Sequence, residues 1–203
     1  MLNDVTVFNI REYLSAQGDR DLGEDELRQI LSEFLCDKNP DVERFLKEQA
    51  IEFTRKNQSV TYLVFSNDDA SLVGYFTLTI KPITVNADNF SNTMKRKIAR
   101  VSELDEENGT YTLSAYLIAQ LGKNYKDGAN RKITGNQLLQ AAIETIKELQ
   151  YMAGGMVIFL EAENREKLIH FYEKENEFKQ FDVRETKSDN EHIHTLVQML
   201  KVM

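Results

Sequence analysis

Apolar residues recur along the chain with two periods, and these periods separate the predicted helices from the predicted strands. Residues that return every three or four positions form one apolar face, as Leu27, Ile30 and Leu31 do in the first long helix. Helical patterns cover residues 24–36, the segment that starts at Pro40, residues 135–150 and residues 164–175. Alternating or fully apolar runs predict strands at residues 5–10, 60–65, 72–80, 110–121, 156–160, 178–183 and 192–202.

The predicted order of elements is β-α-α-β-β-β-α-β-α-β-β, which indicates an α/β (α+β) fold. The strands at 110–121 and 156–160 are joined through a helix, and such a crossover makes two strands parallel. The other connections favour antiparallel pairing. We therefore expect a central mixed, mostly antiparallel sheet with helices on both faces. The chain is read as a single domain, 1–203, with a polar insertion at about 82–108.

A loop that contains glycine and several cations leads from the strand at 110–121 to the helix that begins near Gly135. The first N–H groups of a helix lack partners within the helix and carry positive partial charge, so this junction suits an anion such as a phosphate. The cations of the loop are Lys123, Lys126, Arg131 and Lys132.

Composition narrows the range of partners and locations. A formal net charge of -8 does not provide the global attraction expected of a nucleic-acid-binding protein. No apolar run approaches the roughly 18 to 20 residues that span a bilayer, and the N-terminus lacks the pattern of a signal peptide, so we expect a cytoplasmic protein with no membrane partner.

Cysteine and histidine are too sparse for a disulfide framework or a metal site. The only cysteine, Cys36, is expected to be a buried structural thiol near the end of the first long helix. His192 and His194 could share one face of a strand, but a zinc site needs further ligands at suitable spacing. We therefore expect no metal.

With this order of elements, the chain resembles the GNAT N-acetyltransferase superfamily, in which the corresponding strand, loop and helix hold acetyl-coenzyme A. In that family the loop pattern Gln/Arg-x-x-Gly-x-Gly/Ala gives backbone N–H groups to the cofactor pyrophosphate. The matching hexad here runs from Asn130 to Gly135, and Asn130 and Ile133 depart from the pattern. A β-branched residue is an outlier at positive φ, so Ile133 cannot copy a glycine there. The loop, which is also longer than usual, must adapt.

A second match begins at Glu163, in a segment that resembles the closing helix of the family, although Glu177 stands where that pattern has glycine. The resemblance implies that Tyr172 is the general acid that protonates the departing coenzyme A thiolate. A phenol with a pKa of about 10 can give its proton to a thiolate that titrates a little lower. The implied cofactor-binding residues are Leu121, Lys123, Asn130, Arg131, Lys132, Ile133, Thr134, Gly135, Asn136 and Asn164.

The N-terminal half carries a narrower resemblance, to the GNAT toxins of toxin-antitoxin pairs, in residues 34–50, 61–64 and 72–78. That resemblance implies the α-amino group of aminoacyl-tRNA as acceptor. Such an amine, with a pKa of about 8, needs less help from a base than lysine does. This fits the lack of an obvious dedicated base. The acidic candidates that could act through water are Glu103, Asp105, Glu106 and Glu107.

Three functions stay open at this point. The first is an acetyl-CoA-dependent N-acetyltransferase that transfers acetyl directly to the amine of a small molecule or a protein. The second is a GNAT toxin that acetylates aminoacyl-tRNA. Its tRNA would have to bind to the cation-containing loop before Gly135 and to Lys95, Arg96, Lys97 and Arg100. The third is a non-catalytic acyl-CoA-binding module, suggested by the atypical loop. Self-association as a homodimer also stays open.

Overall fold

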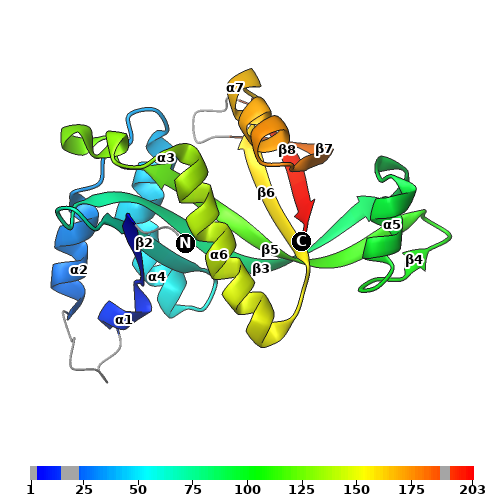
Figure 1. Ribbon diagram of the computed structural model, residues 1–203, viewed down its shortest axis with the longest axis horizontal. Helices are drawn as coiled ribbons and strands as arrows, with labels where there is room; N and C mark the ends of the chain where they lie inside the picture. Colours follow the sequence, from blue (N-terminus) through cyan, green and yellow to red (C-terminus); the bar gives the residue numbers. More distant parts are fainter. Residues whose placement is uncertain (1–3, 15–22, 188–192) are drawn as a thin grey trace. The chain divides into compact units, whose positions relative to one another are not determined.

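The computed structural model describes residues 4–14, 23–187 and 193–203 (Figure 1). The first half contains β1 (Val5–Asn9), α1 (Arg11–Leu14), α2 (Gly23–Ser32), α3 (Pro40–Arg44), the π-helical turn η1 (Phe45–Gln49), α4 (Ala50–Arg55), β2 (Val60–Ser66), β3 (Leu72–Asn86), the 3-10 turn η2 (Ala87–Asn89) and α5 (Asn92–Ile98). The second half contains β4 (Leu104–Asp105), β5 (Thr110–Lys123), the 3-10 turn η3 (Lys126–Arg131), α6 (Gly135–Ala153), β6 (Val157–Glu163), α7 (Glu166–His170), the π-helical turn η4 (Phe171–Glu175), β7 (Lys179–Lys187) and β8 (Ile193–Val202).

The described strands form an 8-stranded sheet in the order β1-β2-β3-β5-β6-β8-β7, with β4 paired to β5. β5 and β6 are parallel, whereas β1 with β2, β2 with β3, β4 with β5, β6 with β8 and β7 with β8 are antiparallel. The predicted mixed, mostly antiparallel sheet is therefore confirmed, including the parallel pair across α6.

The chain divides into two compact units. Unit 1 comprises Met1–Thr79 and Ile118–Glu148, and unit 2 comprises Ile80–Leu117 and Leu149–Met203. β3, β5 and α6 each contribute residues to both units.

Unit 1 is built around a core to which α2, α3, η1, α4 and the adjacent strands contribute. Leu27, Leu31 and Leu46 are fully or almost fully buried in this core. Two glycines allow close packing. A Cβ on Gly122 would lie 2.4 Å from Cγ1 of Val42, and a Cβ on Gly74 would lie 2.9 Å from the carbonyl oxygen of Gly122. A larger residue at either position would push neighbouring elements apart.

The first long helix is shorter than predicted. α2 ends at Ser32, and the N–H of Leu35 donates to the side chain of Asn124 instead of continuing the helix. Cys36 therefore lies in the connection to α3 and not in a helix, although it is buried as expected, with 4% of its surface exposed. The apolar period of the helix continues to Phe34 and Leu35, but the helix ends earlier, where the backbone of Leu35 is bound by Asn124, 89 residues away.

Unit 2 contains the region read as a polar insertion. β3 continues to Asn86, six residues beyond the predicted strand, and Ile83 and Val85 bury alternate side chains in the core of this unit. After η2, the short helix α5 buries Ile98, and β4 pairs with the start of β5. Residues 82–108 thus form regular elements, whose apolar positions were too widely spaced to give a recognisable period.

Candidate functional site

The loop between β5 and α6 makes its sharp turn earlier than the family pattern implies. Asp127 (φ 49°) and Gly128 (φ 77°) adopt the left-handed conformation within η3. Ile133 is not among the residues with positive φ, and it is buried to 1% exposure. The expectation that Ile133 cannot copy a glycine is confirmed. The sharp turn of the loop lies at Asp127 and Gly128, and Ile133 anchors the loop by burying its apolar side chain.

The start of α6 is closed by a capping box between Thr134 and Gln137. The N–H of Gln137 donates to the Thr134 hydroxyl oxygen (3.1 Å), and Oε1 of Gln137 accepts from the N–H of Thr134 (2.8 Å). Two of the N–H groups at this helix start are thereby occupied. An anion bound here would use the N–H of Gly135, the residue retained from the family pattern.

Replacing Thr134 by alanine is expected to lower the free energy of unfolding by about 0.5 to 2 kcal/mol, because the substitution removes an N-cap hydrogen bond. Urea denaturation would measure the change. Thr134→Ser keeps the hydroxyl and should lose much less. Equal losses in the two variants would show that the methyl group of Thr134, and not its hydrogen bond, stabilises the helix start.

Two of the four cations of the loop are engaged by carboxylates within unit 1. Lys126 forms an ion pair with Glu33, and Lys132 forms one with Asp69. Hydrogen bonds from Lys132 and Ser71 lower the pKa of Asp69 to about 2. A phosphate that used Lys132 would have to compete with Asp69, a residue that sequence reasoning did not include.

The other two cations lack such partners within the described chain. Arg131 is exposed and makes no ion pair with the residues that the structure describes. Lys123 is half-buried, and burial together with the nearby charge of Lys38 lowers its pKa. Lys38 itself lies 4.7 Å from the ring centroid of Tyr125. Arg131 and Lys123 are therefore the loop cations best placed to meet an anion.

Asn124 joins three separate segments of unit 1 and was missed by the sequence analysis. Its Oδ1 accepts from the N–H of Leu35 (2.9 Å) and of Lys126 (3.0 Å). Its Nδ2 donates to the carbonyl oxygens of Glu33 (3.1 Å) and Leu72 (2.8 Å). The side chain is buried to 3% exposure. The amide thus fixes the β5 end of the β5–α6 loop to the α2–α3 connection and to β3.

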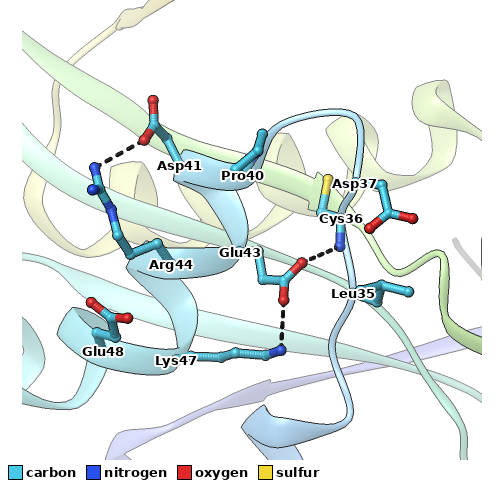
Figure 2. Close-up of a pocket in the computed structure, with 9 residues that line it drawn as sticks. All are labelled: Leu35, Cys36, Asp37, Pro40, Asp41, Glu43, Arg44, Lys47 and Glu48. Atoms are coloured by element: carbon cyan, nitrogen blue, oxygen red, sulfur yellow. Dashed lines mark hydrogen bonds and ion pairs between the residues drawn. The ribbon is translucent and has the colours of Figure 1, made fainter. Parts of the chain in front are cut away.

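A pocket of about 380 Å³ opens in unit 1 between the α2–α3 connection and the helix from α3 into η1 (Figure 2). Glu43 accepts from the backbone N–H of Cys36 (2.7 Å) and pairs with Lys47 (2.6 Å). These contacts lower the pKa of Glu43, the Cys36 N–H being the larger cause. The lining residues are Leu35, Cys36, Asp37, Pro40, Asp41, Glu43, Arg44, Lys47 and Glu48.

In unit 2 the parallel ladder between β5 and β6 is short. It comprises three pairs, from Ala115 with Val157 to Leu117 with Phe159. β6 continues beyond Phe159 on its other side, where it pairs with β8 as far as Glu163. Asn164 follows directly, with its side chain exposed and its backbone N–H donating to the carbonyl oxygen of Thr195 (3.1 Å).

Tyr172 lies in the π-helical turn η4, which follows α7. Its ring makes edge contacts with Phe171 (centroids 4.9 Å apart) and Phe178 (5.8 Å). The residue is half-exposed, yet burial of the phenol group raises its pKa to about 12. Among the described residues, none forms a hydrogen bond with the Tyr172 hydroxyl. π-Helical turns are frequent at functional sites, and this one presents a neutral, uncommitted proton donor.

Glu177, which stands where the family pattern has glycine, adopts the left-handed backbone conformation that glycine favours. Its φ is 61°, in the left-handed region, and its carboxylate lies 3.4 Å from Nζ of Lys201. The N–H of Phe178 donates to the carbonyl oxygen of Tyr172 (2.9 Å) and closes the turn. The turn after η4 therefore uses a left-handed residue that is not glycine.

Glu177→Gly is expected to raise the free energy of unfolding by about 0.5 to 1 kcal/mol. Relief of the left-handed conformation, worth about 1 to 2 kcal/mol, outweighs the greater flexibility of glycine in the unfolded chain. The exposed ion pair with Lys201 contributes little. Chemical denaturation would test this, with Glu177→Ala as the control that removes the carboxylate but keeps the strain. A gain in the alanine variant would mean that the carboxylate itself destabilises the fold.

The predicted site residues fall into two groups. Leu121, Lys123 and the hexad from Asn130 to Gly135, with Asn136, lie together around the β5–α6 junction of unit 1. Asn164 and Tyr172 lie in unit 2, after β6. Thr134, Arg131, Lys132 and Asn136 are exposed, whereas Ile133 is the one residue of the hexad that is buried.

The candidate bases and metal ligands add little to this site. Asp105 organises the turn after β4, where its carboxylate accepts from the N–H groups of Glu107 (3.1 Å) and Asn108 (3.2 Å). The described residues contain no group of three or more His, Cys, Asp or Glu placed to hold a metal ion. His192 lies outside the described residues. In the same part of the chain, no helix is both long and apolar enough to cross a membrane.

No protein-family model matches the chain, and no curated protein matches it significantly. Solved structures do match. AtaT complexed with acetyl-methionyl-tRNAfMet aligns with a TM-score of 0.60 and 18% identity over 95% of this chain and 94% of AtaT. A tyrosine-to-phenylalanine mutant of KacT aligns with a TM-score of 0.60 and 17% identity over 96% of this chain and 95% of KacT.

A further similar structure is a mutant AtaT toxin bound to the C-terminus of the antitoxin AtaR and acetyl-CoA, with a TM-score of 0.52 and 17% identity over 96% of this chain and 94% of that one. At these identities the likeness establishes the fold. The chain has a GNAT-like fold, as its order of elements predicted, and the likeness extends over almost all of both chains.

Proposed function

We propose that this protein is an N-acetyltransferase that transfers acetyl from acetyl-CoA directly to an amine. The observation that carries the proposal is that each unit holds one of the two features that the family resemblance implies. Unit 1 has an anion-suited loop before α6, and unit 2 has an unpaired phenol at Tyr172 in the π-helical turn η4. The likeness to a structure with acetyl-CoA bound supports the choice of cofactor.

The cofactor would supply the acetyl thioester, and the chain would hold it at both ends. The N–H of Gly135 and the side chain of Arg131 would bind the pyrophosphate, since charge-assisted hydrogen bonds are stronger than neutral ones. Backbone groups of β5 from Leu121 to Lys123, together with Asn164, would contact the pantetheine arm. The N–H of Leu121 would donate to the oxyanion, where fixed dipoles stabilise developing charge best.

The chemistry requires three proton movements. The acceptor amine attacks the thioester carbonyl, the C–S bond breaks, and Tyr172 gives its proton to the departing thiolate while the new amide nitrogen loses one to solvent. Solvent then returns a proton to the Tyr172 phenolate. Because the pKa of Tyr172 is raised to about 12, the phenol stays protonated through the neutral range, and the same shift makes it a weaker acid toward the thiolate than a phenol with a pKa of about 10. The rate should therefore rise with pH as the acceptor amine loses its proton, and not fall with ionisation of Tyr172.

Thermal unfolding with and without acetyl-CoA tests cofactor binding. Ligand at about 100 times its dissociation constant should stabilise the protein by about 2.7 kcal/mol. Arg131→Ala should weaken this stabilisation, whereas Arg96→Ala, which removes another exposed arginine outside the loop, should leave it unchanged. Absence of any shift at saturating acetyl-CoA would contradict the proposal. Binding without release of coenzyme A, whatever amine is offered, would favour the non-catalytic module.

A second candidate is acetylation of the α-amine of an aminoacyl-tRNA. The observation that favours it is the likeness to AtaT with acetyl-methionyl-tRNAfMet, which covers 95% of this chain and so includes the N-terminal half. Incubation with acetyl-CoA and a mixture of aminoacylated tRNAs would give acetylated aminoacyl-tRNA, and expression in a bacterial host would arrest growth. Acetylation of small amines alone, with tRNA inert, would exclude this candidate and keep the broader one.

A further inference from the structure

The pocket between the α2–α3 connection and the helix from α3 into η1 has the size and lining of a small-molecule site (Figure 2). Its volume of about 380 Å³ lies within the roughly 300 to 1,000 Å³ typical of ligand pockets. Leu35, Cys36 and Pro40 supply apolar surface, and every other lining residue is charged. A ligand that fits this pocket therefore combines an apolar part with charge.

The walls of the pocket are held in place by hydrogen bonds within unit 1. The N–H of Leu35 donates to Oδ1 of Asn124 (2.9 Å), and the carbonyl oxygen of Leu35 accepts from the N–H of Tyr125 (2.7 Å). Glu43, which lies on α3, accepts from the N–H of Cys36 (2.7 Å) and so joins the helix to the α2–α3 connection. A ligand therefore meets a preformed site and loses little binding energy to reorganisation of the protein.

The charges of the lining leave two carboxylates without a cation. Both cations of the pocket, Arg44 and Lys47, pair with carboxylates of the same lining, at 2.9 and 2.6 Å. The remaining carboxylates, Asp37 and Glu48, are exposed and form no ion pair with any residue that the structure describes. An anion would be repelled by this excess of negative charge, whereas a cation would be attracted by it.

The two unpaired carboxylates are separated from each other. Asp37 belongs to the α2–α3 connection and Glu48 to η1, and Figure 2 shows them at opposite ends of the pocket. Among the described residues, no three His, Cys, Asp or Glu side chains are placed to hold one metal ion. A single metal ion is therefore a poor match for this pocket. Two cationic groups joined by an apolar chain can each meet one carboxylate.

From these observations we propose that the pocket binds a small organic dication, in which two ammonium groups are joined by an aliphatic chain. One ammonium group pairs with Asp37 and the other with Glu48. The chain between them lies on the apolar surface of Leu35 and Pro40. The proposal does not depend on the acetyltransferase function, because such binding requires neither acetyl-CoA nor a chemical step.

Isothermal titration calorimetry in the absence of acetyl-CoA tests the proposal. The probes are putrescine, cadaverine and hexamethylenediamine, which differ in chain length, and butylamine, which has one ammonium group. At least one diamine should bind, and more tightly than butylamine does. Asp37→Asn and Glu48→Gln should each weaken the binding of that diamine by about two- to fivefold, the effect of losing one exposed ion pair. Added salt should weaken it as well.

A matched control separates binding in the pocket from general attraction to an acidic protein. Asp25→Asn with Glu26→Gln removes two negative charges from exposed positions on α2 that do not line the pocket, and it should leave the affinity unchanged. Asp37→Asn with Glu48→Gln removes the same charge from the pocket, and circular dichroism would check that it folds. The proposal is overturned if no diamine binds or if diamines bind no better than butylamine. It is also overturned if the control variant loses as much affinity as the pocket variant.

Discussion

Tyr172→Phe is expected to lower kcat for acetyl transfer by about 10²- to 10⁴-fold, the range typical of losing a general acid. The variant lacks the only atom that can protonate the departing thiolate in the proposed mechanism. The ring and its contacts with Phe171 and Phe178 are retained, so the fold should be unaffected. Steady-state release of coenzyme A with any accepted amine would measure the loss.

Two comparisons separate a chemical role of Tyr172 from a structural one. The dissociation constant for acetyl-CoA should stay within about twofold of wild type, because the hydroxyl acts on the leaving group and not on the bound ground state. Tyr151→Phe, which removes a hydroxyl from a tyrosine that is 94% exposed, should leave kcat unchanged. An unchanged kcat in Tyr172→Phe would exclude this residue as the acid.

Asn124→Ala is expected to lower the free energy of unfolding by about 3 to 5 kcal/mol, since each buried polar group left without a partner costs about 1 to 3 kcal/mol. The substitution removes partners from the N–H groups of Leu35 and Lys126 and from the carbonyl oxygens of Glu33 and Leu72. Water can satisfy some of these groups, which keeps the loss below the full sum. Denaturation by urea would give the value.

Asn92→Ala provides the matched control, because Asn92 is an exposed residue at the start of α5. The free energy of unfolding of Asn92→Ala should differ from that of wild type by less than about 0.5 kcal/mol. A loss below about 1 kcal/mol in Asn124→Ala would mean that the loop segments hold their positions without the amide. Amide hydrogen exchange at Leu35 and Lys126 would then have to remain slow, which offers an independent check.

The order of elements could be predicted because it depends on local periodicity. The apolar stripe of α6 and the fully apolar run of β6 each carry a pattern of their own. The extension of β3 beyond Ile80 was not found, because alternate positions there are polar and Pro82 suggested a break. Likewise α5 carries only a few apolar residues, too few to show a helical face.

The site was predictable only where a family pattern could be laid on the sequence. Tyr172 and Gly135 came from that resemblance, and their chemical roles stay predictions. Asn124 could not be found in this way, because its partners lie 89 to 91 residues away for Leu35 and Glu33. The pairing of Lys132 with Asp69 spans 63 residues and was equally invisible. Long-range polar contacts leave no periodic trace in a sequence.

Cys36 gives the protein an internal reporter of its own unfolding. It is the only thiol in the chain, it is buried to 4% exposure, and burial raises its pKa. Thiolates react with disulfide reagents far faster than buried thiols, so the folded protein should be nearly silent toward such a reagent. One equivalent becomes reactive when unit 1 opens. A disulfide reagent that changes colour on reaction with the thiol of coenzyme A will also react with Cys36 once unit 1 unfolds. In the absence of cofactor, the colour therefore measures the number of protein molecules in which unit 1 is unfolded.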